Sequence, residues 1–262
     1  MERYTWEKLG EQEKPSWYLH PLVAKQKRDV HLALIRRWAG DCRPERLLKT
    51  DLFEEAFGGD HILGDLFPEA RLRCGIDEAF ATVRAAAMRQ KALAPGFLVT
   101  DVRQTALRDG CLDLIISTST LDHFPDRKNF VQSTREIARL LRPGGRLVLT
   151  LDNPWNSLFH PLRWLSQRKG APFPLGYTPT IATLRRDLSE AGFHVEAEDW
   201  LIHNPRGVST AVFLMLSKLL GRRANPCIAT LLAAFALLGQ LPTRRFTACF
   251  QAITALKRRP PV

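Results

Sequence analysis

The sequence has few of the features that stabilise secreted domains or anchor membrane proteins. Its five cysteines are scattered through 262 residues, are odd in number and include no C-x-x-C pair. This argues against a disulfide framework or any metal site, and for a reducing compartment. No apolar leader is visible in residues 1–13, and no apolar run reaches the roughly 20 residues of a spanning helix. We therefore expect a cytoplasmic protein, if membrane-associated then at the inner face of the membrane.

Acidic charge is scarce in the last third of the chain. The net charge of +11 divides into +2 over residues 1–45, zero over 46–155 and +9 over 156–262. A nucleic-acid-binding protein usually carries its basic face through the core of the fold, so we expect no nucleic-acid partner. The basic residues instead accompany two apolar segments predicted as helices, Val208–Leu220 and Cys227–Leu241. This pairing favours peripheral contact with an anionic membrane surface or an anionic substrate, with packing over a sheet as the alternative for the helices.

Hydrophobic periodicity predicts strands that alternate with helices. The expected strands are 46–51, 72–76, 97–100, 111–117, 146–151, 194–203 and 247–256. The expected helices, besides the two apolar segments, are 21–39, 79–93, 130–141 and 180–191. Such alternation predicts parallel βαβ units in an α/β fold. No G-x-G-x-x-G follows the first strand, which argues against a nicotinamide dehydrogenase.

An acidic residue follows each of the first three predicted strands: Asp51, Asp77 and Asp101. Ligands of open parallel sheets bind at the carboxyl ends of the strands. A carboxylate after the second strand suits the two hydroxyls of a ribose, and one after the third suits the amino group of adenine. The ordered set predicts an adenosine site. Taken singly, each Asp is more commonly a helix cap or a turn residue.

Two longer runs carry a family resemblance. They are DVRQTALRDGCLDLIISTSTLDHF (101–124) and REIARLLRPGGRLVLTLDN (135–153). Together with GIDEA (75–79), they resemble class I S-adenosylmethionine-dependent methyltransferases. The branch of ubiquinone and menaquinone biosynthesis enzymes is the most similar. The resemblance covers about residues 46–153. It implies a Rossmann-like, mostly parallel sheet of seven strands with an antiparallel last strand, an N-terminal helix and a helical pair inserted near the C-terminus.

The resemblance also implies roles for individual residues. Asp77, with Glu78 as a near alternative, matches the ribose-binding acid, and Asp101 matches the acceptor of adenine N6. Val102 supplies a backbone amide near the adenine ring. The positions that line the methionine moiety are Ser117 and Thr118. His123 matches a family histidine and is either a weak catalytic candidate or a structural turn residue.

The first predicted strand departs from the family pattern. The family has an acid and a Gly-x-Gly loop there, whereas this chain reads LKTDLFEE over residues 48–55, with no glycine before Gly58. Asp51, Glu54 or Glu55 remain candidates to hold the amino group of the cofactor, and Lys49 its carboxylate. The alternative is a degenerate fold that no longer binds the cofactor.

These observations predict three regions and one activity. Residues 1–45 form an N-terminal helical cap, 46–153 the S-adenosylmethionine-binding core, and 154–262 an acceptor-side loop, helical insertion and final hairpin. We expect a biosynthetic S-adenosylmethionine-dependent methyltransferase acting on a small-molecule or lipid-linked acceptor; the alternative is a binding or scaffold protein without catalysis. His160 and His203 are further candidates for a base. The expected lid comprises helix 21–39 and the aromatic segment 154–177.

Overall fold

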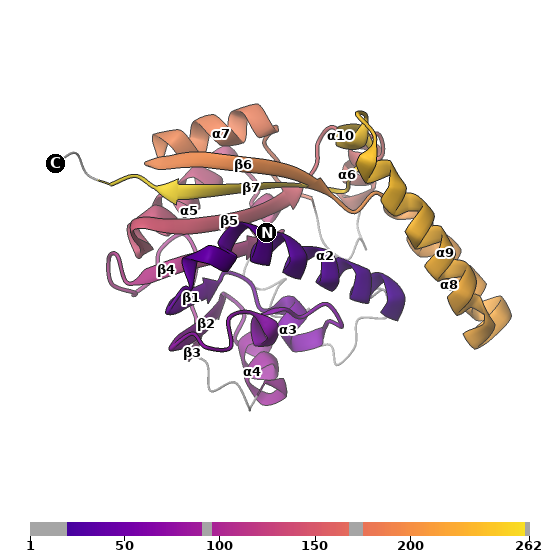
Figure 1. The fold of residues 1–262 in the computed structure, drawn as a ribbon, viewed down its shortest axis with the longest axis horizontal. Coiled ribbons are helices and arrows are strands. Elements are labelled where there is room, and N and C mark those ends of the chain that lie inside the picture. The colour runs from indigo at the N-terminus through magenta and orange to yellow at the C-terminus, as the bar shows by residue number, and fades with distance from the viewer. Residues whose placement is uncertain (1–19, 91–95, 168–174, 260–262) are drawn as a thin grey trace.

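A computed structural model describes residues 20–90, 96–167 and 175–259 of the chain. Leu93, at the end of one predicted helix, and Phe173, in the predicted aromatic segment, lie outside the described residues. The last two strands join the same sheet as the first five (Figure 1), so the predicted boundary at residue 153 falls within one continuous sheet.

The sheet has seven strands in the order β3-β2-β1-β4-β5-β7-β6. Six strands run parallel, and β7 is antiparallel to both of its neighbours. The predicted Rossmann-like fold is therefore confirmed, including its single antiparallel strand. The strands are β1 (Arg46–Lys49), β2 (Leu72–Asp77), β3 (Gly96–Val99), β4 (Leu112–Thr118), β5 (Leu141–Asp152), β6 (Phe193–Leu201) and β7 (Phe250–Lys257).

Helices cover both faces of the sheet, because side chains of alternating strand residues point to opposite faces. On β4, Leu114 and Ile116 belong to one buried cluster, with residues of α2 (Pro21–Ala39), α3 (Phe53–Phe57) and α4 (Phe80–Arg89). Ile115 belongs to a second buried cluster on the other face of the sheet, with residues of α5 (Arg127–Leu140) and α7 (Ile181–Glu190).

Helix α2 is part of the main core rather than a lid. Leu32, Leu34 and Ile35 are buried in the cluster that also contains Leu47 and Val148 of the sheet. A helix that buries this much apolar surface cannot lift from the sheet without a large loss of hydrophobic stabilisation. The prediction of α2 as a movable cover is therefore wrong.

Two predicted boundaries differ for local reasons. Strand β5 begins at Leu141, five residues earlier than predicted, and its register with β4 shifts between Leu112 and Leu114. Helix α5 begins at Arg127, three residues earlier than predicted, because the carboxylate of Asp126 accepts a hydrogen bond from the Asn129 amide at 2.9 Å.

A helical hairpin is inserted between β6 and β7. Helix α8 (Val208–Leu220) and helix α9 (Ala224–Leu237) project from the body of the molecule, and short helices α6 (Phe159–Ser166) and α10 (Arg244–Thr247) lie at the base of the hairpin (Figure 1). Val23 of α2 packs against Phe213 of α8 and Ile228 of α9. Within the described residues, no helix is both long enough and apolar enough to cross a membrane.

A close backbone approach joins the loop after β4 to the segment before α7. The amide of Gly176 donates to the carbonyl of Asp122 at 2.9 Å, and the amide of Tyr177 to the carbonyl of Phe124 at 2.7 Å. A Cβ atom at Gly176 would clash with the Phe124 carbonyl oxygen and lie 2.8 Å from that of Asp122. Both acceptors are backbone atoms, so a side chain here requires the loop to move.

We therefore predict that Gly176→Ala lowers the free energy of unfolding by about 1–3 kcal/mol, as overpacking typically does. Gly40→Ala is the matched control, because a Cβ at Gly40 meets no atom within 4 Å. Denaturant unfolding of both variants measures the difference. Equal stability of the two would contradict the close approach at Gly176.

Candidate functional site

A pocket lies at the carboxyl ends of the parallel strands. Side chains that follow β1, β2 and β3 line one side of it, and the loop after β4 lines the other. This is the edge of the sheet at which open α/β folds bind their ligands. The lining residues are Thr50, Asp51, Phe53, Asp77, Glu78, Thr82, Thr100, Asp101, Val102, Arg103, Thr120, His123, Phe124 and Pro125.

Asp77, the last residue of β2, is held by two backbone amides. Its Oδ1 accepts from Ala79 at 2.9 Å, and its Oδ2 accepts from Leu52 at 3.2 Å. Burial raises the pKa of Asp77 to about 6, although these two hydrogen bonds act to lower it. A carboxylate oxygen accepts more than one hydrogen bond, so Asp77 retains acceptor capacity for a ligand.

Asp101 is covered by a cation that the sequence analysis did not consider. The Nε atom of Arg103 lies 3.0 and 2.9 Å from the two carboxylate oxygens of Asp101, and the Arg103 amide donates to Oδ1 at 2.8 Å. The Arg103 guanidinium also bonds Asn129 and lies 5.1 Å from the centre of the Phe124 ring. Arg103 therefore covers Asp101 within the lining of the pocket.

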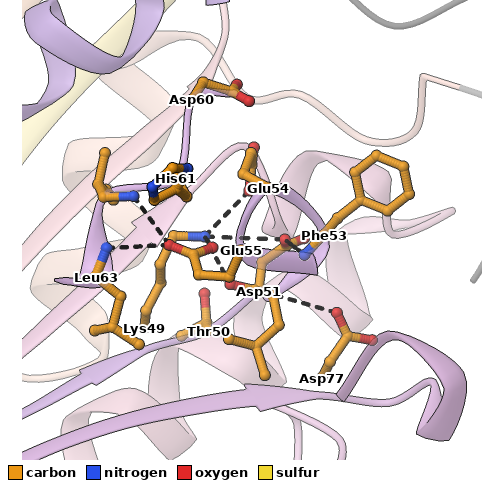
Figure 2. Close-up of polar contacts among 12 residues, drawn as sticks. Lys49, Thr50, Asp51, Phe53, Glu54, Glu55, Asp60, His61, Leu63 and Asp77 are labelled. Atoms are coloured by element: carbon orange, nitrogen blue, oxygen red, sulfur yellow. Dashed lines mark hydrogen bonds and ion pairs between the residues drawn. The ribbon is translucent and has the colours of Figure 1, made fainter. Parts of the chain in front are cut away.

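The segment after β1 contains a buried ion network in the place of a glycine loop (Figure 2). Lys49 is 1% exposed, and its Nζ atom donates to the carbonyl of Asp51 at 2.6 Å. The same Nζ lies 3.1 Å from Glu54 Oε2 and 2.9 Å from Glu55 Oε2. Burial alone would lower the pKa of Lys49, but these carboxylates reverse the effect and raise it.

A second lysine, from α2, completes this network. Lys27 Nζ lies 3.0 Å from Glu54 Oε1 and 2.6 Å from Asp60 Oδ2. Burial would raise the pKa of Glu54, yet Lys49 and Lys27 together hold it below its usual value. The network of Lys27, Lys49, Glu54, Glu55 and Asp60 is thus a charged cluster that fastens the loop to α2.

Three of the residues predicted to hold the methionine end of the cofactor lie in this network and outside the lining of the pocket: Lys49, Glu54 and Glu55. Glu55 is fully buried and accepts from the amides of Ile62 at 3.2 Å and Leu63 at 3.1 Å. Both lysine-paired oxygens of Glu54 are occupied, and Lys49 points beneath the loop. The structure therefore gives neither Lys49 nor Glu55 access to a ligand.

Asp51 is the acid of this loop that lines the pocket. Its Oδ1 accepts from the Phe53 amide at 2.8 Å. Burial, followed by the charge of Glu54, raises the pKa of Asp51 well above its usual value, against the influence of Lys49. Two neighbouring strand ends therefore both present carboxyl groups that hold protons more tightly than in water.

The hydroxyls in the pocket are not those predicted. Ser117 and Thr118 end β4 but are buried outside the lining. Thr50 and Thr120 line the pocket in their place, with Thr50 Oγ1 within hydrogen-bond distance of Ser117 Oγ at 2.9 Å and of Thr120 Oγ1 at 3.2 Å. Sequence position alone could not distinguish these residues, because all four are small hydroxyl residues near the ends of adjacent strands.

His123 lines the pocket, and beside it lie two buried acids, Asp122 and Asp152, that were not predicted from the sequence. Asp122 Oδ2 accepts from the Asp152 amide at 2.6 Å, and Arg206 forms an ion pair with the carboxylate of Asp152. Both acids are 1% exposed. Burial and then the Asp152 charge raise the pKa of Asp122. The pair joins the loop after β4 to the end of β5 and, through Arg206, to the base of the hairpin.

The residues of the pocket fit S-adenosylmethionine. A ribose diol and an adenine amino group need acceptors, and an amino group and a sulfonium carry positive charge. Asp51, Asp77, Glu78 and Asp101 supply carboxyl groups for these parts. The carboxylate of such a ligand needs donors. Thr50 and Thr120 supply hydroxyls within the lining near Asp51, whereas Arg103, the arginine of the lining, is engaged by Asp101.

The fold and its acid-lined strand ends define a protein with the methyltransferase type of Rossmann-like fold. Residues 58–149 match the sequence model of a family described as a methyltransferase domain. The match begins immediately after α3, so it omits β1 and the loop that departs from the family pattern. Comparison with curated proteins gives no match in sequence.

Solved structures share this fold at low sequence identity. A structure described as a putative sarcosine dimethylglycine methyltransferase from Galdieria sulphuraria is 15% identical, with 98% of each chain covered and a TM-score of 0.60. The N-methyltransferase NodS from Bradyrhizobium japonicum WM9 is 15% identical over 90% of this chain and 98% of its own, with a TM-score of 0.55.

Another similar structure is the [4+2]-cyclase SpnF, at 15% identity, 98% and 92% coverage and a TM-score of 0.58. Structural likeness at this identity therefore establishes the fold alone. The comparisons thus show a match to a methyltransferase domain over residues 58–149 and a shared fold over most of the chain.

We predict that Lys49→Met lowers the free energy of unfolding by about 3–5 kcal/mol, because it leaves buried carboxylates without their cation. Lys25→Met is the control, since the Lys25–Asp29 pair is exposed and such pairs contribute at most about 1 kcal/mol. Adding Glu55→Gln to Lys49→Met should recover part of the loss. Denaturant unfolding tests both points, and equal effects of Lys49→Met and Lys25→Met would disprove the network's role.

Proposed function

We propose that this protein is an S-adenosylmethionine-dependent methyltransferase that acts on a small-molecule or lipid-linked acceptor. The observation that carries the proposal is the ordered set Asp51, Asp77 and Asp101, which line one pocket at the ends of three adjacent parallel strands. The resemblance to the branch of quinone-biosynthesis enzymes stays a prediction.

In this proposal each strand end binds one part of the cofactor. Asp77 accepts hydrogen bonds from the ribose hydroxyls, with Glu78 beside it. Asp101 accepts from the adenine amino group, next to the Val102 amide. Asp51 pairs with the cationic amino group of the methionine moiety. The side chains of Thr50 and Thr120 take the place that the resemblance gave to Ser117 and Thr118.

The bound cofactor would supply an electrophilic methyl group together with its own leaving group. The protein's contribution is then to align the acceptor and to exclude water. A base is required where the acceptor is an alcohol or phenol. Of the three histidines considered, His123 lines the pocket, whereas His160 is exposed on α6 and His203 is buried with Nδ1 2.8 Å from Thr247 Oγ1. This favours His123.

The rival hypothesis is a binding or scaffold protein of the same fold without catalysis. Incubation of the protein with methyl-labelled S-adenosylmethionine and a cell extract distinguishes the two. Label in the aqueous fraction supports a small-molecule acceptor, and label in the organic fraction supports a lipid-linked one. Cofactor binding without transfer to either fraction supports the rival.

We predict that Asp77→Ala weakens the binding of S-adenosylhomocysteine by about 2–4 kcal/mol, because two hydrogen bonds to a charged acceptor are lost. Asp101→Ala should have a smaller effect, since one amino group is involved and Arg103 already covers the carboxylate. Isothermal titration measures both, with exposed Glu69→Ala as the control. Thermal unfolding verifies that each variant is folded. No heat with the wild-type protein at millimolar ligand would refute the proposal.

Binding of S-adenosylhomocysteine should also depend on pH through Asp77. The pKa of Asp77 is raised to about 6, so its carboxylate is charged above pH 6 and protonated below it. Because the ribose hydroxyls donate to the charged form, affinity should be constant above about pH 7 and fall by up to tenfold per unit below about pH 6.

The Asp77→Asn variant, which cannot titrate, separates this effect from others. Asp51, Glu78 and Lys49 also influence the titration of Asp77, so a residual pH dependence in Asp77→Asn belongs to those groups. Titrations from pH 5 to pH 8 test the prediction. An unchanged pH profile in Asp77→Asn would show that Asp77 does not control binding.

A further inference from the structure

The α8–α9 hairpin exposes an unusual amount of apolar surface. One side of it is packed, since Phe213, Ile228 and Leu232 are buried against Val23 of α2. The outer side carries large apolar side chains that are half or more exposed, including Leu219 at 71% and Leu237 at 60%. Val208 and Met215 continue this surface along α8. Exposed apolar side chains gathered on one hairpin indicate an interaction site.

The charged residues of the hairpin itself all have one sign. After Asp199 the sequence contains no aspartate or glutamate, while it contains nine lysines and arginines. Lys218, Arg222 and Arg223 lie at the tip where α8 meets α9, and Arg222 and Arg223 are exposed. Among the described residues, none of these three forms an ion pair with a carboxylate. Their charges are therefore available to an external anion.

We infer that the α8–α9 hairpin docks this protein on an anionic lipid bilayer. Apolar side chains at its tip, such as Leu219, enter the boundary between headgroups and acyl chains, while Lys218, Arg222 and Arg223 contact the anionic headgroups. Buried apolar area and electrostatic attraction act together in such peripheral binding. The 13 residues of α8 span about 20 Å, which suits surface insertion rather than crossing.

Charge decides between a bilayer and a second copy of this chain as the occupant. A second hairpin would bring the same three cations toward the first, with no acidic residue in residues 200–262 to neutralise them. Like charges in contact oppose association. An anionic surface instead neutralises every cation at the tip, so the hairpin is complementary to the bilayer and not to itself.

The base of the hairpin is connected to the pocket by a series of contacts. Its base follows Arg206, which pairs with Asp152, and the Asp152 amide bonds Asp122, the neighbour of His123. Docking through the hairpin tip would therefore tether the pocket to the bilayer through these contacts at the base. The docking itself does not depend on the proposed methyl transfer.

Flotation with vesicles of phosphatidylcholine containing graded phosphatidylglycerol tests the docking on the full chain. We expect binding to rise with phosphatidylglycerol content and to weaken as salt is raised. Each basic residue near an anionic surface contributes roughly a fivefold change in partitioning. The Arg222→Glu/Arg223→Glu variant should therefore bind at least about 30-fold more weakly than the wild type.

Matched variants on α4 control for charge and apolarity in general. Arg84→Glu/Arg89→Glu makes the same charge change on an exposed helix away from the hairpin and should bind like the wild type. Leu219→Ser should weaken binding by about tenfold or more at every lipid composition. Met88→Ser, at a residue 59% exposed on α4, should have no effect.

Two exposed cysteines report the orientation. Cys227 lies on α9 and Cys42 beyond α2. A polarity-sensitive fluorophore should shift to shorter wavelength on anionic vesicles when it is attached to Cys227 in a Cys42→Ser variant. It should not shift on Cys42 in a Cys227→Ser variant.

Other outcomes overturn the inference. Binding that ignores lipid charge, or an equal loss of binding in the α4 charge variant, would refute specific docking through the hairpin. No flotation, together with a dimer in sedimentation that Leu219→Ser dissociates, would assign the apolar surface to a second copy. Titration of S-adenosylhomocysteine into the hairpin variants should match the wild type, so failure of docking and failure of cofactor binding are separate results.

Discussion

The ammonium group of Lys49, 1% exposed, lies at the end of the inner strand β1, within 3.1 Å of Glu54 and 2.9 Å of Glu55. A buried charge without partners would cost several kcal/mol, so the loop has to bring carboxylates to it. This requirement fixes the start of α3 directly after the strand. Leu52 is consequently buried against Gly75, and its amide donates to Asp77. The orientation of the predicted ribose acceptor thus depends on the lysine beneath it.

The charge network and the pocket have opposite electrostatic characters. Glu54 is held below its usual pKa by two lysines, whereas the pKa values of Asp51 and Asp77 are raised by burial. A carboxyl whose folded pKa exceeds its unfolded value destabilises the folded state at neutral pH, and this penalty lessens as pH falls. Glu54 contributes in the opposite direction, because its pairing stabilises the fold at neutral pH. Strongly perturbed pKa values of this kind cluster at functional sites.

Periodicity predicted the fold because each helix buries one face, while the strands, covered on both faces, read as short apolar runs. The bounds of α2 and α8 matched the pattern of apolar residues, and each of the seven predicted strands overlaps an observed one. The site was less predictable because it depends on where side chains turn. Lys49 directly precedes Thr50, yet the side chain of Lys49 is buried in the ion network, whereas Thr50 lines the pocket. The contact of Arg103 with Asp101 is local in sequence, but no periodic pattern indicates it.

The buried residues Asp122 and Asp152 connect parts of the molecule that are far apart in the sequence. The Asp152 amide bonds Asp122 at 2.6 Å across two strand ends, and Arg206 pairs with Asp152 from the segment that leads into α8. Gly176 closes the same loop from the other side. A loop held by buried ionic and backbone contacts on both sides has little freedom to adapt to different ligands. Under the proposed function, selection of the acceptor then depends on the surfaces that surround this loop, and the most distinctive of them is the basic, apolar hairpin whose base Arg206 anchors.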